Sequence, residues 1–218
     1  MRKLIMSTLM TLDGVVEDPG GFSDFSLRGW GNSYFDDEAQ QLALSTLLGA
    51  DLLLYGRVTY EFFSGFWPSA RGPYADRLNS LPKLVASTTL REPLEWNAKV
   101  IEGDVAEEVG RLKGQAGGDI VMYGSTNLMY TLTRHDLIDE YRIWVYPLVL
   151  GNRPQAFLHP GRTQGPPPGQ HLAPGLGRRR PYLPPSFAAY VVAEHTLAAQ
   201  QLQRHPRARC LVASHANS

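Results

Sequence analysis

The chain has 218 residues, of which 43% are hydrophobic, and its acidic and basic residues balance to a net charge of zero. A chain of this size and composition can bury one sizeable core, so we expect one folded domain. The absence of net positive charge argues against a dedicated nucleic-acid-binding protein. No apolar run is long enough to span a bilayer, so no membrane segment is expected.

Short apolar runs alternate with amphipathic segments, which predicts an α/β fold with a mostly parallel central sheet flanked by helices. In chain order we predict a strand at 3–9, a Gly-rich loop to residue 31, a helix at 36–49, a strand at 51–55, a helix from residue 57, strands at 83–86 and 98–101, a helix at 104–114, a strand at 119–123, a helix at 125–134 and a strand at 141–150. Only 187–202 is expected to add an element after that.

Composition changes abruptly near residue 152. Residues 1–150 carry 20 acidic and 13 basic residues, whereas residues 151–218 carry eight arginines against the single acidic residue Glu194. We therefore assign 1–152 to the folded domain and 153–218 to an atypical Arg/Pro-rich tail, expected to be irregular. The favoured explanation is a shifted reading frame from about residue 153, and the alternative is a natural tail.

The single cysteine, Cys210, allows no intramolecular disulfide, which fits a reducing cytoplasm. The first six residues have the basic-then-apolar start of a signal peptide. However, Asp13 interrupts the apolar run early, and no small-residue cleavage site follows. We therefore interpret this segment as a first strand and expect a cytoplasmic protein.

Three segments place small or hydroxyl residues directly after an apolar strand. These segments are 55–60, 86–89 and 123–126. Glycine lets a ligand approach the backbone, a helix N-terminus offers N–H groups, and arginine supplies a planar cation for phosphate. The carboxyl ends of parallel strands are where open α/β folds bind ligands. Together the segments predict a site for an extended diphosphate cofactor, although the G-x-G-x-x-G fingerprint of Rossmann domains is absent.

Leu12–Gly14, Gly56–Tyr60, Ser87–Thr88 and Tyr123–Ser125 occur in the order and spacing seen in the dihydrofolate-reductase-like superfamily, and residues 139–151 add to the match. The chain most resembles stand-alone relatives of the reductase domain of the bifunctional riboflavin deaminase–reductase, over about residues 1–152. In that superfamily two further strands complete the sheet, and here they are expected to be missing.

The resemblance implies bound NADPH and hydride transfer to a C=N or C=O bond of a pterin-like or ribosylaminopyrimidine-like substrate. By resemblance, phosphate would meet Gly56, Arg57 and Thr59. The adenosine 2′-phosphate side would meet Ser87 and Thr88, and the pyrophosphate Gly124 and Ser125. No zinc-deaminase signature is present and no metal is expected.

On the substrate side, the resemblance points to Asp13 as the catalytic residue, to orient the substrate or relay a proton. The alternative is that Asp13 only caps the turn before Gly14. Asp37 lies near the position of the substrate carboxylate in dihydrofolate reductases, and Trp30 could wall a pocket for a flat ring; a helix-dipole partner and a packing residue are the alternatives.

The partner expected is a small-molecule substrate, with neither nucleic acid nor membrane, and the resemblance suggests a homodimer. A different class of function also fits the composition. In that reading the reductase-like body is catalytically inactive, and the Arg-rich tail binds a partner or a polyanion.

Overall fold

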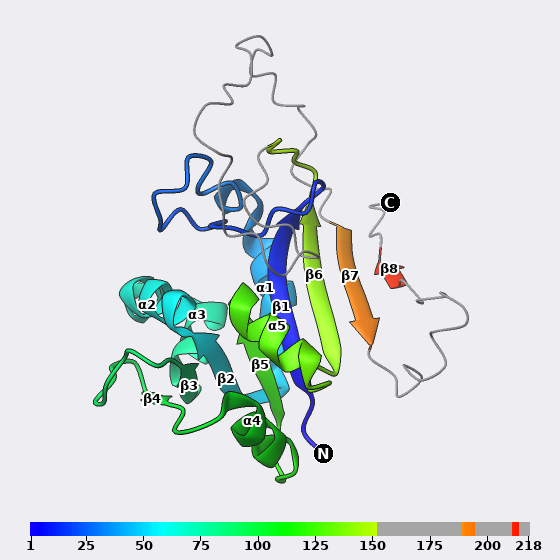
Figure 1. Cartoon of the computed structure of the whole chain (residues 1–218). Coiled ribbons are helices and arrows are strands. Elements are labelled where there is room, and N and C mark those ends of the chain that lie inside the picture. The colour runs from blue at the N-terminus through cyan, green and yellow to red at the C-terminus, as the bar shows by residue number, and fades with distance from the viewer. Residues whose placement is uncertain (152–188, 195–210, 214–218) are drawn as a thin grey trace, which may run out of the picture.

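One mixed sheet forms the centre of the protein in the computed structural model, which describes residues 1–151, 189–194 and 211–213 (Figure 1). Within these residues the strands are β1 (Leu4–Thr11), β2 (Ala50–Gly56), β3 (Lys83–Ala86), β4 (Ala98–Val100), β5 (Asp119–Tyr123), β6 (Glu140–Tyr146), β7 (Ala189–Glu194) and β8 (Leu211–Ala213). They lie in the order β4-β3-β2-β5-β1-β6-β7-β8. Strands β1 to β6 are parallel, and β7 and β8 are antiparallel to their neighbours.

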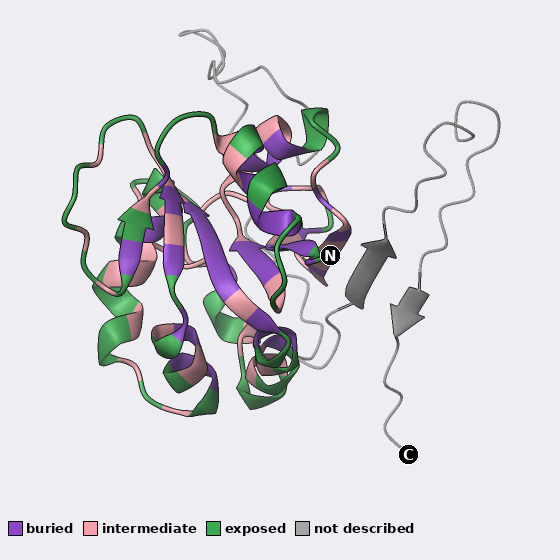
Figure 2. Ribbon diagram, turned by 90° about the horizontal axis from the view of Figure 1, so that it is seen from below, coloured by how far each residue is buried: buried purple, intermediate pink, exposed green. Residues whose placement is uncertain are grey.

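Helices cover both faces of this sheet. They are α1 (Asp37–Leu48), α2 (Arg57–Phe66), α3 (Pro73–Ser80), α4 (Val105–Lys113) and α5 (Thr126–Arg134), with short 3₁₀ turns at Asn32–Tyr34 and Trp67–Ser69. Buried residues of α1 and α3 belong to one hydrophobic cluster, and those of α4 and α5 to another. Figure 2 shows the buried strands between these helical layers.

The alternation of side chains along each strand explains the two clusters. In β2, Leu52 and Leu54 face the cluster shared with α4 and α5, whereas Leu53 and Tyr55 face the cluster shared with α1 and α3. Successive side chains of a strand point to opposite faces, so a strand covered on both sides must be apolar at nearly every position. This is why the parallel strands could be predicted from continuous apolar runs.

The helix boundaries follow from side-chain caps. The Asp36 carboxylate accepts a hydrogen bond from the N–H of Ala39 at the start of α1, and the Asp104 carboxylate accepts from the N–H groups of Ala106 and Glu107 at the start of α4. Both helices were predicted within two residues of their observed ends. By contrast, α3 was not predicted. It begins at Pro73, which suits a first helical position, but it is short and follows Gly72, which offers no side-chain cap.

The strand predicted at 141–150 is shorter than expected. It ends at Tyr146, because Pro147 has no N–H to continue the ladder. The chain then turns toward the end of β1, where the Leu148 carbonyl accepts a hydrogen bond from the N–H of Leu12. This turn brings residues 148–151 next to the loop that follows β1.

The expectation that the terminal strands are missing was wrong. β7 pairs antiparallel with β6 from Glu140 to Val145, and β8 pairs with β7. An unpaired edge of β6 would leave a row of backbone groups without partners, and β7 removes that edge. The irregular tail predicted for residues 153–185 lies outside the described residues. In the described part of the chain, no helix has the length and apolar composition needed to cross a bilayer.

Candidate functional site

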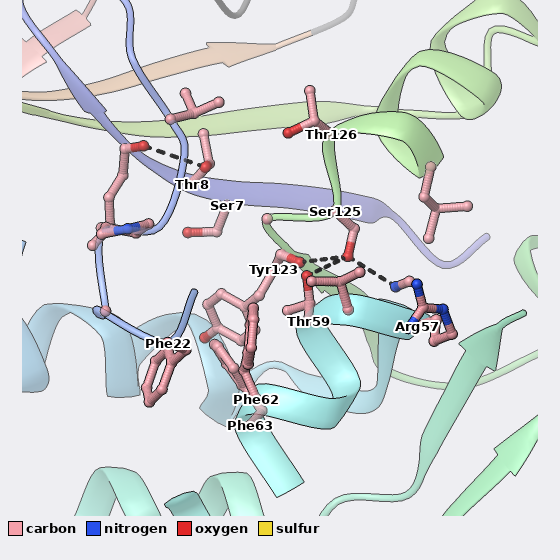
Figure 3. A pocket seen from close by; sticks show the side chains of 18 of the residues that line it. Ser7, Thr8, Phe22, Arg57, Thr59, Phe62, Phe63, Tyr123, Ser125 and Thr126 are labelled. Atoms are coloured by element: carbon pink, nitrogen blue, oxygen red, sulfur yellow. Dashed lines mark hydrogen bonds between the residues drawn. The ribbon is translucent and has the colours of Figure 1, made fainter. Parts of the chain in front are cut away.

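One large cavity opens where the parallel strands end. Its volume is about 1420 Å³, and the carboxyl ends of β1, β2, β3 and β5 contribute to its lining. Pockets for drug-sized ligands measure about 300–1,000 Å³, so this cavity has room for a larger ligand or for two ligands. Figure 3 shows Thr8 and Phe22 on one side, and Arg57 and Ser125 on the other. All the residues predicted to bind cofactor line it, namely Gly56, Arg57, Thr59, Ser87, Thr88, Gly124 and Ser125.

The Ser125 side chain joins two strand ends. Its hydroxyl oxygen accepts a hydrogen bond from the Gly56 N–H at 2.8 Å and donates to Thr59 Oγ1 at 2.9 Å. Ser125 has a φ of +58° and Gly124 a φ of +51°, the left-handed region that a non-glycine residue adopts at a cost of roughly 1–2 kcal/mol. Strained backbone of this kind concentrates at functional sites.

The packing at Gly56 explains why glycine stands there. A Cβ added at this position would lie 3.2 Å from Ser125 Oγ and 3.3 Å from Ser125 Cβ. These contacts are too tight for the hydroxyl to keep its place. Glycine therefore lets β2 and the start of α5 approach closely enough to share a hydrogen bond.

Two of the helices that begin at the cavity lack side-chain caps. At α2 and α5 no side chain caps the first turn, whereas α1 and α4 are capped by aspartates. The first N–H groups of a helix have no partner within the helix, and the helix dipole adds partial positive charge there. Two uncapped N-termini at one cavity are suited to an anion such as a diphosphate.

Arg57 and the hydroxyl segment after β3 lie at the same side of the cavity. Arg57 forms an ion pair with Glu61 at 2.8 Å, and its side chain is 45% exposed. The Ser87 hydroxyl accepts hydrogen bonds from the N–H groups of Thr89 and Leu90, which fixes the turn. Because a hydroxyl accepts and donates at once, Ser87 can still donate its proton to a ligand.

An aromatic wall, which sequence reasoning missed, lines the other side. Phe22 from the loop after β1 stacks on Phe62 of α2 at 5.3 Å between ring centroids, and Phe63 packs 5.9 Å from Tyr123 (Figure 3). Further lining aromatic residues are Phe35, Phe66, Trp67, Tyr74 and Trp144. The signal was present in the sequence. Residues 62, 63 and 66 of α2 are all phenylalanine, and residues three or four positions apart lie on the same face of a helix.

Among the described residues, three carboxylates line the cavity. Asp18 accepts hydrogen bonds from the N–H groups of Gly21, Phe22 and Ser23. Partial burial raises the pKa of Asp18, but these bonds outweigh it and hold the pKa below its ordinary value. Asp104 caps α4, and the backbone hydrogen bonds lower its pKa.

Glu17 is the third carboxylate and was not singled out from the sequence. Its Oε2 is buried and has no hydrogen-bond partner among the described residues. Burial raises the pKa of the Glu17 carboxyl, and the neighbouring charge of Asp18 raises it further.

Three residues predicted for the substrate side do not line the cavity. The Asp13 carboxylate accepts hydrogen bonds from the Thr11 hydroxyl at 2.6 Å and from the Gly151 N–H at 2.9 Å. Burial raises the pKa of Asp13, but these bonds and one from Leu150 N–H hold it below its ordinary value. Trp30 is buried and packs edge-on against Tyr146, and Asp37 is exposed in the first turn of α1. Their functional roles stay predictions.

The amino-acid sequence of this chain matches a family model and known proteins. The model of the RibD C-terminal domain family matches residues 2–168, beyond the boundary at 152 expected from composition. The uncharacterized protein YyaP of Bacillus subtilis (strain 168) is 30% identical over 162 residues, which cover 72% of this chain and 81% of that protein.

Solved structures share the fold. A protein from Shewanella sp. PV-4 named for riboflavin biosynthesis has a TM-score of 0.51 at 24% identity, covering 68% of this chain and 79% of that one. RibD from Acinetobacter baumannii has a TM-score of 0.52 at 14% identity, covering 74% of this chain and 50% of that one. The expected architecture, a mostly parallel central sheet flanked by helices, is confirmed.

Proposed function

This chain belongs to the RibD C-terminal domain family, and we propose that it is an NADPH-dependent reductase. The proposed reaction reduces a C=N or C=O bond of a pterin-like or ribosylaminopyrimidine-like ring. One observation carries the proposal: three separate strand-end segments, chosen from the sequence for cofactor binding, converge on a single cavity with two uncapped helix N-termini.

The residues of the cavity fit an extended diphosphate cofactor. Gly56 and Gly124 carry no side chain that would keep a ligand from the backbone, and the N-termini of α2 and α5 favour negative charge. Gly124, Ser125 and the start of α5 would hold the pyrophosphate. Arg57 and Thr59 would meet phosphate at the start of α2, and Ser87 and Thr88 would face the adenosine 2′-phosphate.

In this proposal one side of the cavity binds the cofactor and the other binds the substrate. When bound, the cofactor supplies the hydride, while the protein supplies binding, orientation and a site that excludes water. The aromatic wall gives a flat ring surfaces on which to stack, as aromatic groups prefer. Phe22, from the loop after β1, packs on Phe62 of α2, so this loop would contribute to the substrate side.

The test is a titration of the full chain with NADPH and with NADH, followed by nicotinamide fluorescence. A screen of oxidised pteridines and aminopyrimidines then measures loss of nicotinamide absorbance. We expect saturable binding of NADPH and turnover with at least one ring compound. If neither cofactor binds at concentrations up to about 1 mM, the upper end of usual KM values, the proposal is overturned.

A further inference from the structure

Glu17 differs from the other two carboxylates of the cavity in having a buried oxygen without a hydrogen-bond partner among the described residues. The Asp18 carboxylate accepts hydrogen bonds from backbone N–H groups and from the Ser23 hydroxyl. The Asp104 carboxylate accepts hydrogen bonds from N–H groups in the first turn of α4. Glu17 Oε2 is buried and accepts no hydrogen bond from any described residue. A buried polar oxygen left unpaired costs roughly 1–3 kcal/mol, and the cost is higher for a charged group, which favours the protonated carboxyl.

The backbone around Glu17 is fixed. The indole Nε1 of Trp30 donates a hydrogen bond to the Glu17 carbonyl at 2.8 Å, and Trp30 itself is 8% exposed. Two residues earlier, the N–H of Val15 donates to the Thr11 hydroxyl at 2.9 Å. Trp30 therefore serves the cavity indirectly, by holding the segment that carries the Glu17 side chain. A carboxyl on a fixed segment has the preorganisation that proton transfer requires.

The surroundings of Glu17 favour its protonated form. The Glu17 carboxyl is partly buried, and burial penalises a carboxylate more than a carboxylic acid. Asp18, next in the chain, adds a negative charge that acts in the same direction. The remaining titratable or charged groups of the described lining are Arg57, Arg71, Tyr74, Asp104 and Tyr123.

We propose that Glu17 is the proton donor to the substrate, a role that rests on the proposed reductase function. As the ring carbon of the C=N or C=O bond receives a hydride from a reduced nicotinamide, the π electrons move to the nitrogen or oxygen. The O–H bond of the Glu17 carboxyl breaks, and its proton forms the new N–H or O–H bond. Glu17 is left as a carboxylate and regains a proton from water before the next turnover. The substrate class is thus a flat ring whose basic nitrogen or oxygen faces Glu17.

The test compares Glu17→Gln with Glu17→Asp and with Glu95→Gln, an exposed glutamate outside the cavity. Glutamine keeps the size of the side chain but cannot donate a carboxyl proton. We expect Glu17→Gln to lower kcat about a hundredfold or more, within the range of general acid catalysis, with NADPH affinity unchanged within about threefold. Glu17→Asp should recover part of the activity, and Glu95→Gln should match the wild type.

Two further readouts separate proton donation from a structural role. Turnover of the wild type should fall as pH rises through the pKa of Glu17, and this alkaline limb should be absent in Glu17→Gln. Carbon NMR of carboxyl-labelled glutamate in the free protein should give Glu17 a titration midpoint above the ordinary value of 4.5.

The contrary outcomes are distinct. Turnover of Glu17→Gln within about twofold of the wild type, with the alkaline limb retained, overturns the role of Glu17 and leaves the reductase function intact. A Glu17 titration midpoint at the ordinary value in the NMR experiment also overturns the role of Glu17 as proton donor. This result counts even if the wild type binds NADPH but reduces none of the screened rings. A wild type that binds no NADPH overturns the reductase function itself, and proton donation falls with it.

Discussion

The hydroxyl oxygen of Ser125 lies 2.8 Å from the backbone nitrogen of Gly56 and accepts its hydrogen bond, although 69 positions separate the two residues in the chain. Ser125 occupies the cap position of α5, yet its hydroxyl does not cap that helix. It instead joins the start of α5 to the end of β2 and, through Thr59, to α2. One side chain therefore sets the distance between two helix N-termini and leaves the first turn of α5 available to a ligand.

Gly56→Ala should disturb this connection. The added Cβ would lie 3.2 Å from Ser125 Oγ, so the hydroxyl must move and the hydrogen bond weakens. Loss of such a bond costs about 0.5–1.5 kcal/mol, which predicts at most about a two- to twelvefold loss of NADPH affinity by fluorescence titration. The control is Gly65→Ala in α2, where an added Cβ meets nothing within 4 Å. That variant should bind NADPH normally and gain roughly 0.5–1 kcal/mol of stability, because alanine favours a helix.

Arg57→Ala should weaken NADPH binding more than NADH binding, because Arg57 and Ser87 follow paired strand ends and we assign the Arg57 guanidinium to the 2′-phosphate, which only NADPH carries. A charge-assisted hydrogen bond to phosphate contributes roughly 1.5–3 kcal/mol, or about ten- to a hundredfold in affinity. The matched control is Arg111→Ala, which removes an exposed arginine with a similar ion pair, to Glu108 on α4. Equal affinity of the wild type for the two cofactors, or equal effects of the two substitutions, would contradict phosphate recognition by Arg57.

Asp13→Asn separates the two roles considered for this residue. The carboxylate accepts hydrogen bonds from Thr11 and from the N–H groups of Leu150 and Gly151, so the variant should lose about 1–2 kcal/mol of stability. Urea denaturation measures this loss, and Asp24→Asn in the same loop should change stability by less than about 0.5 kcal/mol. A hundredfold loss of kcat at unchanged stability would instead support the catalytic role predicted from the sequence.

Lys83 should make stability rise with pH above about 8. Its Nζ is buried, donates to the carbonyls of Asn79 and Leu81, and lies 4.1 Å from the Trp96 ring centre. Burial lowers the pKa of Lys83 from 10.5 to about 8. Between these values the unfolded chain holds a proton that the folded protein has released, so the free energy of unfolding increases with pH. Below pH 8 both states are protonated and this contribution is absent.

The measurement compares wild type and Lys83→Met by urea denaturation just below pH 8 and near pH 9.5. Buried tyrosines such as Tyr74, whose pKa is raised by burial, act in the opposite direction in both proteins. The difference between the two proteins therefore isolates Lys83. It should grow with pH in favour of the wild type, and a constant difference would rule out a lowered lysine pKa.

Local patterns in the sequence determined most of the fold and one side of the site. β3 and β5 were predicted residue for residue, because a parallel strand covered on both faces is a continuous apolar run. The starts of α1 and α4 were predicted at Asp36 and Asp104, whose carboxylates cap these helices, and a helix start depends on a few neighbouring residues. The convergence of the residues proposed to bind the cofactor could be predicted because each segment follows a strand, and parallel strands end at the same edge of a sheet.

Only the tertiary structure decided which acidic residue faces the cavity. Asp13 and Glu17 lie four positions apart in one loop, and no local pattern distinguishes them. The chain after β6 returns to that loop, and its N–H groups bind the Asp13 carboxylate. Trp30, from beyond the next turn, holds the Glu17 backbone and leaves the Glu17 side chain at the cavity. Likewise, an element was expected at 187–202, but only the structure shows that a strand there, Ala189–Glu194, pairs with β6. These outcomes depend on contacts between distant segments, whose hydrogen bonds form only when the sheet has brought them together.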